Sequence, residues 1–269
     1  MAGRRAPSAR QAQRRSLSQN FLRSERLAAE LVADADVQAS DFVVELGAGS
    51  GRLTDALGRR AREVLAVEVD PRWAKHLRAR FSSQPNVRVV ESDLFFAVLP
   101  DQAFRVLANV PFHRSAEVLR HLLDDPTTPL ARADLILQWG AACKRATVWP
   151  STLLGVYWGA WYTFTVSRRL PACCFIPVPD VDAGVLTVGR RAHALAPEVR
   201  AQEFRTFVAA GFSCPRLRQG LADFFSDRRL RRLADSLAFP RDAAARDLDV
   251  HQWTGLFRAY DSGARSRGS

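Results

Sequence analysis

A glycine-rich turn between an apolar strand and a helix is the feature that most restricts how this chain can fold. A short, mostly apolar stretch, 42–46, runs into Gly47-Ala48-Gly49-Ser50-Gly51, and a helical pattern follows over residues 52–60. Glycine lets the backbone adopt positive φ angles and approach a ligand closely, so the turn predicts a binding loop. The GxGxG spacing lacks the third glycine position of the dinucleotide fingerprint and the GKS or GKT ending of a phosphate loop, which disfavours both ligands. A plain strand-to-helix turn is the alternative.

Short apolar stretches alternate with helical patterns through the first half of the chain. This alternation predicts βαβ units and therefore an α/β fold with a parallel sheet. At 269 residues the chain can form one large domain with a small appendage. The predicted strands are 42–46, 63–69, 86–91, 104–109 and 134–138.

Acidic side chains stand where two of these strands end. Glu68 closes the second strand, at a distance from the glycine turn that suits hydrogen bonds to both hydroxyls of a ribose. Asp93 follows the third strand, where a carboxylate can accept a hydrogen bond from an adenine amino group. Ligands of open α/β sheets bind outside the carboxyl ends of the strands, so these groups converge on one site. Ribose and adenine without a pyrophosphate indicate S-adenosylmethionine. Taken separately, each acid could equally be a solvated strand end.

The tetrad Asn109-Val110-Pro111-Phe112 follows the strand 104–108 and suits one chemical task. The lone pair of an exocyclic nucleobase amine is delocalised into the ring, which makes the nitrogen a poor nucleophile. If the Asn109 amide oxygen and the Val110 carbonyl both accept its N–H hydrogens, the nitrogen becomes more tetrahedral and its lone pair is freed. Pro111 would stiffen the turn, and Phe112 offers a face on which an extruded base can stack. An ordinary strand-ending turn is the alternative.

In this order the motifs resemble those of the ribosomal RNA adenine-N6 methyltransferases, and most of all the Erm type. That type modifies one adenine of large-subunit rRNA and confers macrolide-lincosamide-streptogramin B resistance. Val110 stands where the family usually has isoleucine or leucine, a change that should preserve the carbonyl geometry. The resemblance covers most of residues 16–190 and rests on Ser18-Gln19-Asn20-Phe21-Leu22, Glu45 to Gly51, Glu68, Asp93-Leu94, Asn109 to Phe112, and Phe175-Ile176-Pro177-Val178-Pro179-Asp180-Val181-Asp182.

The resemblance implies an activity and a set of site residues. The enzyme would transfer a methyl group directly from S-adenosylmethionine to N6 of one adenine in 23S rRNA. Asn109, Val110, Pro111 and Phe112 would meet the target base, and Phe175 would close over the other face of that base. The cofactor would be bound by Asn20, Leu22, Glu45, Gly47, Gly49, Gly51, Glu68, Val69, Asp93, Leu94 and Asn109.

The family's fold is a Rossmann-like class I methyltransferase sheet of seven, mostly parallel strands with a small C-terminal helical domain. Apolar stretches at 157–166 and 184–189 would complete the sheet. We therefore expect a disordered basic arm at 1–17, an S-adenosylmethionine-dependent methyltransferase domain at 18–190, a helical RNA-binding domain at 191–260 and a flexible tail at 261–269. Two rival functions stay open: an enzyme that dimethylates small-subunit 16S rRNA during ribosome assembly, and a non-catalytic RNA-binding factor.

Charge supports an RNA partner. The chain has 39 Lys and Arg against 28 Asp and Glu, a formal net charge of +11, and a basic surface attracts phosphates. A GC-rich genome would also favour arginine, so the sign of the charge is more informative than the choice of residue. Residues 1–23 carry six arginines and no acid, which suits an arm that becomes ordered on RNA; a mitochondrial transit peptide is the alternative.

Apolar residues return at helical spacing between residues 191 and 260. One set is Phe204, Phe207, Val208 and Phe212, and a second is Leu230, Leu233 and Leu237. The first set predicts a core-facing helix. The arginines beside the second set, which are either a solvated face or an RNA-facing patch, are Arg228, Arg229, Arg231 and Arg232.

Other classes of protein fit the sequence poorly. No apolar run is long enough to span a bilayer, and no secretory signal is present. The four cysteines form no CxxC pair, which favours reduced, mostly buried thiols in the cytoplasm, and the five histidines lack metal-ligand spacing. We expect a cytoplasmic monomer without a metal.

Overall fold

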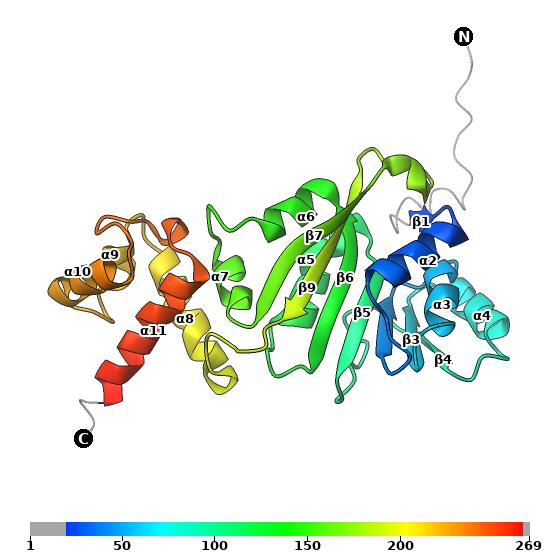
Figure 1. The fold of residues 1–269 in the computed structure, drawn as a ribbon, viewed down its shortest axis with the longest axis horizontal. Helices are drawn as coiled ribbons and strands as arrows, with labels where there is room; N and C mark the ends of the chain where they lie inside the picture. The colour runs from blue at the N-terminus through cyan, green and yellow to red at the C-terminus, as the bar shows by residue number, and fades with distance from the viewer. Residues whose placement is uncertain (1–19, 266–269) are drawn as a thin grey trace, which may run out of the picture. The chain divides into compact units, whose positions relative to one another are not determined.

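The computed structural model describes residues 20–265, so the predicted arm at 1–17 lies outside the described residues. Its main feature is a seven-stranded sheet with the strand order β4-β3-β2-β5-β6-β9-β7 (Figure 1). Four neighbouring pairs in it run parallel: β2 with β3, β2 with β5, β3 with β4, and β5 with β6. The predicted α/β sheet is confirmed. Its strands are β2 (Phe42–Leu46), β3 (Glu63–Glu68), β4 (Val87–Glu91), β5 (Phe104–Asn109), β6 (Leu130–Gln138), β7 (Tyr162–Leu170) and β9 (Ala183–Arg190).

The parallel pairing places the carboxyl ends of five strands, β4, β3, β2, β5 and β6, along one edge. The chain passes from β2 to β3 and β4 on one side and then to β5 on the other side of β2, so the direction of winding reverses at β2. Such a switch point leaves a crevice at the carboxyl edge of an open α/β sheet. Every residue of β2 is buried, as expected for a central strand that is covered on both faces.

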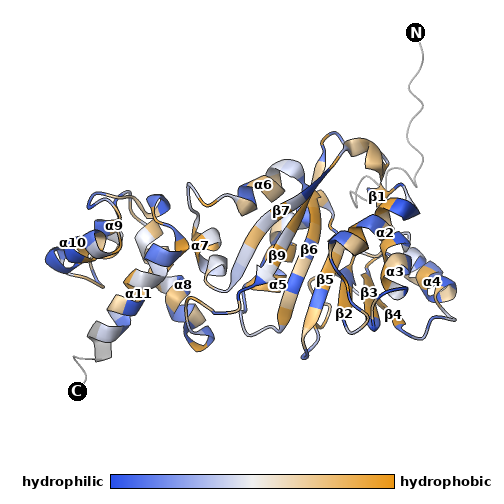
Figure 2. Cartoon of the chain, in the orientation of Figure 1, coloured by the Kyte–Doolittle hydropathy of each residue, from blue (hydrophilic) through white to orange (hydrophobic). Residues whose placement is uncertain are grey.

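Helices cover these strands and begin with defined caps. The Ser24 side chain accepts a hydrogen bond from the Leu27 N–H at the start of α2 (Glu25–Asp34). The Asp70 side chain caps α4 (Pro71–Arg80), whose first residue is proline, a favoured position for that residue. Helices α3 (Arg52–Gly58) and α5 (Ser115–Leu123) complete this set. Apolar residues of α2, α3 and the strands meet in one core, and in Figure 2 the strands are predominantly hydrophobic.

A small two-stranded sheet was not predicted from the sequence. β1 (Phe21–Leu22) pairs antiparallel with β8 (Phe175–Ile176), and the Arg23 N–H donates to the Cys174 carbonyl at 2.8 Å. We call this pair the β1–β8 clip. Two residues per strand are too few to give an alternating pattern, so nothing in the sequence indicated it. The clip holds the chain just after residue 20 beside the main sheet.

Two predicted elements have different bounds in the structure. The stretch 157–166 was expected to be a strand, but it begins inside helix α7 (Leu153–Gly159), and β7 starts only at Tyr162. A short apolar run does not distinguish a buried helix from a buried strand, and Tyr157 and Trp158 are buried here in a helix. β6 begins at Leu130 rather than at residue 134. The charged Arg132, which pairs with Asp134 at 2.7 Å, interrupts the apolar pattern, so the sequence did not indicate the first residues of this strand.

Contacts divide the described chain into two compact units, and the division differs from a single break at residue 190. The first contains residues 20–122, 128–143 and 165–188; the second contains 123–127, 144–164 and 189 onward. The second unit has its own aromatic core, in which Phe207 packs against Trp253 and Phe257. Its predicted helical character is confirmed by α8 (Ala201–Phe212), α9 (Leu217–Gly220), α10 (Asp227–Ser236) and α11 (Val250–Arg265), while α6 (Trp139–Ala146) crosses the boundary.

Two further expectations are tested by this part of the chain. Helix α11 continues to Arg265, inside the predicted flexible tail, because Asp261 pairs with Arg200 and the Ser262 hydroxyl donates to the Arg258 carbonyl. The expectation of mostly buried thiols is wrong: Cys173 is exposed and the other three cysteines are partly exposed. Between residues 20 and 265, no helix is both long and apolar enough to cross a membrane.

Gly51 allows the glycine turn to join α3, and we expect its replacement to destabilise the fold. Gly51 has φ +79°, and a Cβ there would lie 2.7 Å from Leu77 Cδ2 and 3.2 Å from the Phe81 ring. Gly51→Ala should lower the free energy of unfolding by about 1–3 kcal/mol, measured by urea denaturation. Gly140→Ala is the matched control, because a Cβ there meets nothing within 4 Å and alanine favours the helix. Equal stability of the two variants would contradict this packing role.

Candidate active site

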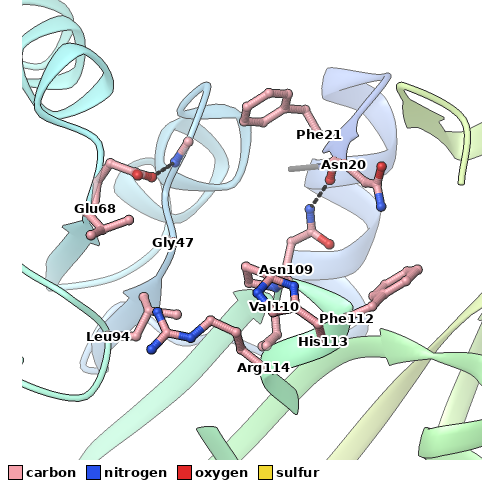
Figure 3. Close-up of a pocket in the computed structure, with 13 residues that line it drawn as sticks. Asn20, Phe21, Gly47, Glu68, Leu94, Asn109, Val110, Phe112, His113 and Arg114 are labelled. Atoms are coloured by element: carbon pink, nitrogen blue, oxygen red, sulfur yellow. Dashed lines mark hydrogen bonds between the residues drawn. The ribbon is translucent and has the colours of Figure 1, made fainter. Parts of the chain in front are cut away.

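A pocket of about 190 Å³ opens at the carboxyl edge of the sheet, within the first unit (Figure 3). It is formed by the segment entering β1, the glycine turn, the end of β3, the loop after β4 and the loop after β5. Sequence-distant motifs that were predicted to act together therefore face one cavity. Its lining residues are Asn20, Phe21, Gly47, Gly49, Glu68, Val69, Leu94, Asn109, Val110, Pro111, Phe112, His113 and Arg114.

Five residues predicted for the site do not line the pocket. Leu22 is only 4% exposed and belongs to the core, and Glu45 is 1% exposed beneath the glycine turn. Gly51 caps α3 and packs against Leu77 and Phe81, as described above. Asp93 turns its carboxylate toward Arg114, and Phe175 is completely buried. In this structure these residues support the walls of the pocket.

Three lining residues were absent from the predicted site. Phe21 belongs to the motif at residues 18–22, but the sequence predicted no contact of its side chain with a ligand. His113 and Arg114 follow the tetrad directly and belong to a 3-10 turn, Phe112–Arg114, that leads into α5. Their position next to the tetrad was the available signal. The sequence did not indicate that this turn would place His113 and Arg114 at the pocket.

The glycine turn is held by the carboxylate of Glu68. One carboxylate oxygen accepts the Gly49 N–H at 2.7 Å, and the other accepts the Asp70 N–H at 2.9 Å. Gly47, Gly49 and Gly51 all have positive φ, at 80°, 52° and 79°. Burial raises the pKa of Glu68 above its usual value, while the backbone N–H groups oppose that shift. The side chain at the end of β3 thus fixes the turn after β2.

Phe21 covers the middle of the turn. A Cβ at Gly49 would lie 2.6 Å from the Phe21 ring, so this contact requires glycine. The Phe21 ring also packs against Trp73 of α4, with ring centroids 5.2 Å apart. An aromatic wall therefore stands on one side of the pocket, carried there by the β1–β8 clip.

Asn109 has its amide orientation set by the segment before β1. Its Nδ2 donates to the Asn20 carbonyl oxygen at 2.7 Å, drawn as a dashed line in Figure 3. A backbone carbonyl can only accept, so the amide group must turn its nitrogen toward Asn20. The Oδ1 atom is consequently left as the acceptor end of the side chain. Asn109 also lines the pocket, which makes it an oriented acceptor at the end of β5.

The rest of the tetrad is held from the core side. The Val110 N–H donates to the Ile136 carbonyl at 3.2 Å, and the whole residue is only 1% exposed. Val110 therefore lines the pocket as an almost fully buried residue. The Phe112 ring is partly exposed and packs edge-on against Phe175, with ring centroids 6.4 Å apart and planes at 76°. The Ser115 hydroxyl donates to the Phe112 carbonyl at 2.8 Å and secures the turn.

Arg114 joins the loop after β4 to the loop after β5. Its Nη1 donates to the Asp93 carboxylate at 3.1 Å, and its guanidinium lies 4.0 Å from the Phe95 ring centroid. Burial alone would raise the pKa of Asp93, but hydrogen bonds from Arg114 and from the Phe95 N–H outweigh it and lower the pKa. Asp93 is therefore an ionised carboxylate with one oxygen already occupied by an arginine.

Glu45 is a second buried acid next to the glycine turn and, unlike Asp93, is mostly uncharged. The Thr54 hydroxyl donates to its carboxyl oxygen at 2.6 Å. Burial raises the pKa of Glu45 to about 8, and the nearby Glu68 adds to the shift, although the Thr54 hydrogen bond opposes it. At neutral pH the Glu45 carboxyl is therefore mostly protonated. Glu45 is therefore a buried structural residue next to the glycine turn and does not line the pocket.

The order of the strands, with a glycine turn after β2 and an oriented asparagine after β5, defines a Rossmann-like class I methyltransferase fold. A model of the ribosomal RNA adenine dimethylase family matches residues 10–261. This chain therefore belongs to that family, and the resemblance found in the sequence is confirmed.

Individual relatives agree with this placement. An rRNA adenine N-6-methyltransferase of Corynebacterium diphtheriae is 34% identical over 195 residues, which cover 72% of this chain and 76% of that protein. The mycinamicin-resistance protein MyrB of Micromonospora griseorubida is 33% identical over 251 residues, 92% of this chain and 79% of that one. The crystal structure of the 23S rRNA methyltransferase ErmE is similar with a TM-score of 0.78 at 28% identity, covering 90% of this chain and 100% of the other.

The buried Glu45 should make the stability of the protein depend on pH. Its pKa rises from 4.5 to about 8 on folding, so the folded protein keeps a proton that the unfolded chain releases between those values. This contribution to stability is complete below about pH 4.5 and is lost as the pH rises through 8.

Glu45→Gln cannot lose that proton, and its amide oxygen still accepts from Thr54. We expect the free energy of unfolding of the variant, relative to the native protein, to increase by a few kcal/mol between pH 5 and pH 8.5. Urea denaturation across this range measures the difference. Parallel pH profiles of the two proteins would show that the proton on Glu45 has no part in stability.

Proposed function

We propose that this protein transfers a methyl group from S-adenosylmethionine to N6 of one adenine in 23S rRNA and so gives resistance to macrolide-type antibiotics. The observation that carries the proposal is the oriented amide of Asn109. Its Nδ2 donates to Asn20, which leaves Oδ1 as the acceptor end of a side chain that lines the pocket, together with the glycine turn and Glu68, the acid predicted to bind the ribose. Family membership and the resistance protein MyrB support the choice of reaction and outcome.

The residues around the pocket fit S-adenosylmethionine. Gly47 lines the pocket with φ +80°, a backbone conformation that glycine adopts without strain. Glu68 would bind the ribose hydroxyls, Val69 and Leu94 would flank the adenine, and Asn20 and the turn would hold the methionine end. Asp93 Oδ1 already accepts the Phe95 N–H at 3.2 Å, and it would accept the adenine amino group through its remaining lone pair. When bound, the cofactor supplies an electrophilic methyl group on a sulfonium.

The protein's own groups would prepare the target nitrogen. Asn109 Oδ1 and the Val110 carbonyl accept the two hydrogens of the adenine amine, which draws its lone pair out of the ring. Pro111, with φ −54° and ψ 123°, keeps the Val110 carbonyl at a fixed angle, and Phe112 stacks on the extruded base. Phe175 holds the Phe112 ring from behind. No strong base is required, because the nitrogen becomes acidic on methylation; alignment and the two acceptors supply the rate.

The C-terminal unit would bind RNA, with the protein acting as a cytoplasmic monomer. The predicted arginine patch on α10 is only partly available for this role. Arg229 donates to the Ala259 carbonyl and lies over the Phe225 ring, so it is engaged within the unit. Arg228, Arg231 and Arg232 are exposed, and α10 is predominantly hydrophilic in Figure 2. Arg231 pairs with Asp227 of the same helix, so Arg228 and Arg232 are the candidates for phosphate contacts.

The proposed substrate can be tested directly. Purified 23S and 16S transcripts are incubated with the protein and labelled S-adenosylmethionine, and the modified base is mapped by primer extension. We expect label in 23S RNA at a single adenine N6. Label at two neighbouring adenines of 16S RNA would identify a small-subunit enzyme instead. Cofactor binding without label in either RNA would favour a non-catalytic factor.

Asn109→Ala should reduce turnover by about a hundredfold or more, because it removes a preorganised group that acts on the reacting nitrogen. Cofactor affinity, measured by calorimetry, should change far less than kcat on the 23S transcript. Val199→Ala, at a 91% exposed side chain in the other unit, is the control and should leave both quantities unchanged. A near-native kcat for Asn109→Ala would overturn the role assigned to this amide.

A further inference from the structure

A second pocket, of about 230 Å³, lies entirely within the second unit and has no role in the proposed transfer reaction. Its walls come from the end of α6, the 147–152 loop, helix α7, the start of β7, and residues 191 and 249–250. Because all of these segments belong to one compact unit, the pocket is formed by that unit alone. Its lining combines positive charge, hydroxyl groups and apolar surface.

The charge of the pocket is strongly positive. Lys144, Arg145 and Arg191 line it, against a single acid, Asp249. The Asp249 carboxylate accepts the Gln252 N–H at 2.8 Å at the start of α11, so its charge is directed toward the helix backbone. Arg191 donates from Nε to the Gly159 carbonyl at 2.8 Å, which fixes the guanidinium beside the pocket. Arg145 lies over the Trp158 ring, 5.3 Å from its centroid. Three cationic side chains around one pocket suit a phosphate group.

The same pocket has an apolar side with an exposed aromatic residue beside it. Val148, Phe164 and Val250 line the wall. Trp149 is 56% exposed; it does not itself line the pocket, but it belongs to the 147–152 loop, in which the neighbouring Val148 and Ser151 do. An inorganic anion would use the cations and leave this apolar side without a partner. A nucleotide would use both, because it carries a phosphate and a flat ring.

We propose that this pocket binds an unpaired nucleotide of the RNA substrate, with the base stacked on Trp149 and its phosphate held by Lys144, Arg145 and Arg191. The proposal rests on the proposed function in that the substrate is RNA. Only an unstacked base can reach an aromatic side chain in this way, so the pocket distinguishes a loop or single strand from a duplex. It would provide a second contact point for RNA, separate from the pocket for the target adenine.

Two substitutions at exposed positions test the aromatic part and the positively charged part of the pocket separately. Trp149→Ala removes an exposed ring. Thr163→Glu places a negative charge in the pocket at an exposed position of β7, and Thr163→Gln is the matched neutral control of the same size. Calorimetry with S-adenosylmethionine reports whether each variant keeps a folded methyltransferase unit, and the far-ultraviolet circular dichroism reports on the helices of the second unit.

Binding is measured by fluorescence anisotropy with two labelled probes of equal length: an RNA hairpin with adenines in its loop, and a fully paired RNA duplex. Trp149→Ala should weaken hairpin binding by about five- to a hundredfold, the usual effect of losing one stacked base, and leave duplex binding within about twofold. Thr163→Glu should weaken hairpin binding at least as much as Trp149→Ala does, while Thr163→Gln should bind like the native protein.

Two results would overturn the proposal. Native-like hairpin binding by both Trp149→Ala and Thr163→Glu would show that no nucleotide enters the pocket. Equal losses of affinity for hairpin and duplex would show a general electrostatic surface.

Methylation of the 23S transcript by the native protein separates this proposal from the proposed function. A native enzyme that methylates 23S RNA while the variants bind normally would refute the pocket alone, and pocket-dependent hairpin binding without methylation would refute the function alone.

Discussion

The hydrogen bond from the Asn109 side chain to the Asn20 carbonyl is the contact on which the proposed chemistry depends. It joins the loop after β5 to a segment 89 positions earlier in the chain. An asparagine amide is nearly symmetric in shape, and only its partners decide which end is nitrogen and which is oxygen. Here the partner is a main-chain carbonyl, so no side-chain substitution at position 20 can reverse the choice. The oxygen that remains is held in place before any ligand arrives, which lowers the entropy lost in aligning the reacting nitrogen.

Two glutamates under the same turn illustrate how the surroundings separate similar side chains. Both oxygens of the Glu68 carboxylate accept backbone N–H groups, and these donors only partly oppose the rise in pKa that burial causes. Glu45 is fully buried and, among the described residues, accepts hydrogen bonds only from Thr54, so burial dominates, and the acid keeps its proton near neutral pH. The glycine turn consequently rests on one hydrogen-bonding acid and one neutral acid, which avoids two buried negative charges in close proximity. A ligand that approaches Glu68 competes with the Gly49 and Asp70 N–H groups for its oxygens.

The central strands and the turn could be predicted because each depends on local rules. Apolar runs between helical patterns gave β2 to β5, and closely spaced glycines gave the turn whose positive φ angles the structure shows. The β1–β8 clip, the helical start of the 157–166 stretch and the Arg114–Asp93 pair could not be predicted. Each depends on partners far apart in sequence or on a burial pattern that strands and helices share. For the same reason Leu22, Gly51 and Phe175 were expected in the pocket: a motif gives the identity of a residue, and packing decides which way it faces.

The β1–β8 clip also has a bearing on how the molecule is assembled. It brings Phe21 and Leu22 against Ile176 and Phe175, about 150 residues later in the chain. Pairings that close so long a loop carry a large entropic barrier and form late. During synthesis, the glycine turn and its neighbouring strands are complete well before β8 leaves the ribosome. The wall that contains Asn20 and Phe21 is therefore secured only after most of the sheet exists, so a nascent chain acquires its scaffold first and its binding competence last.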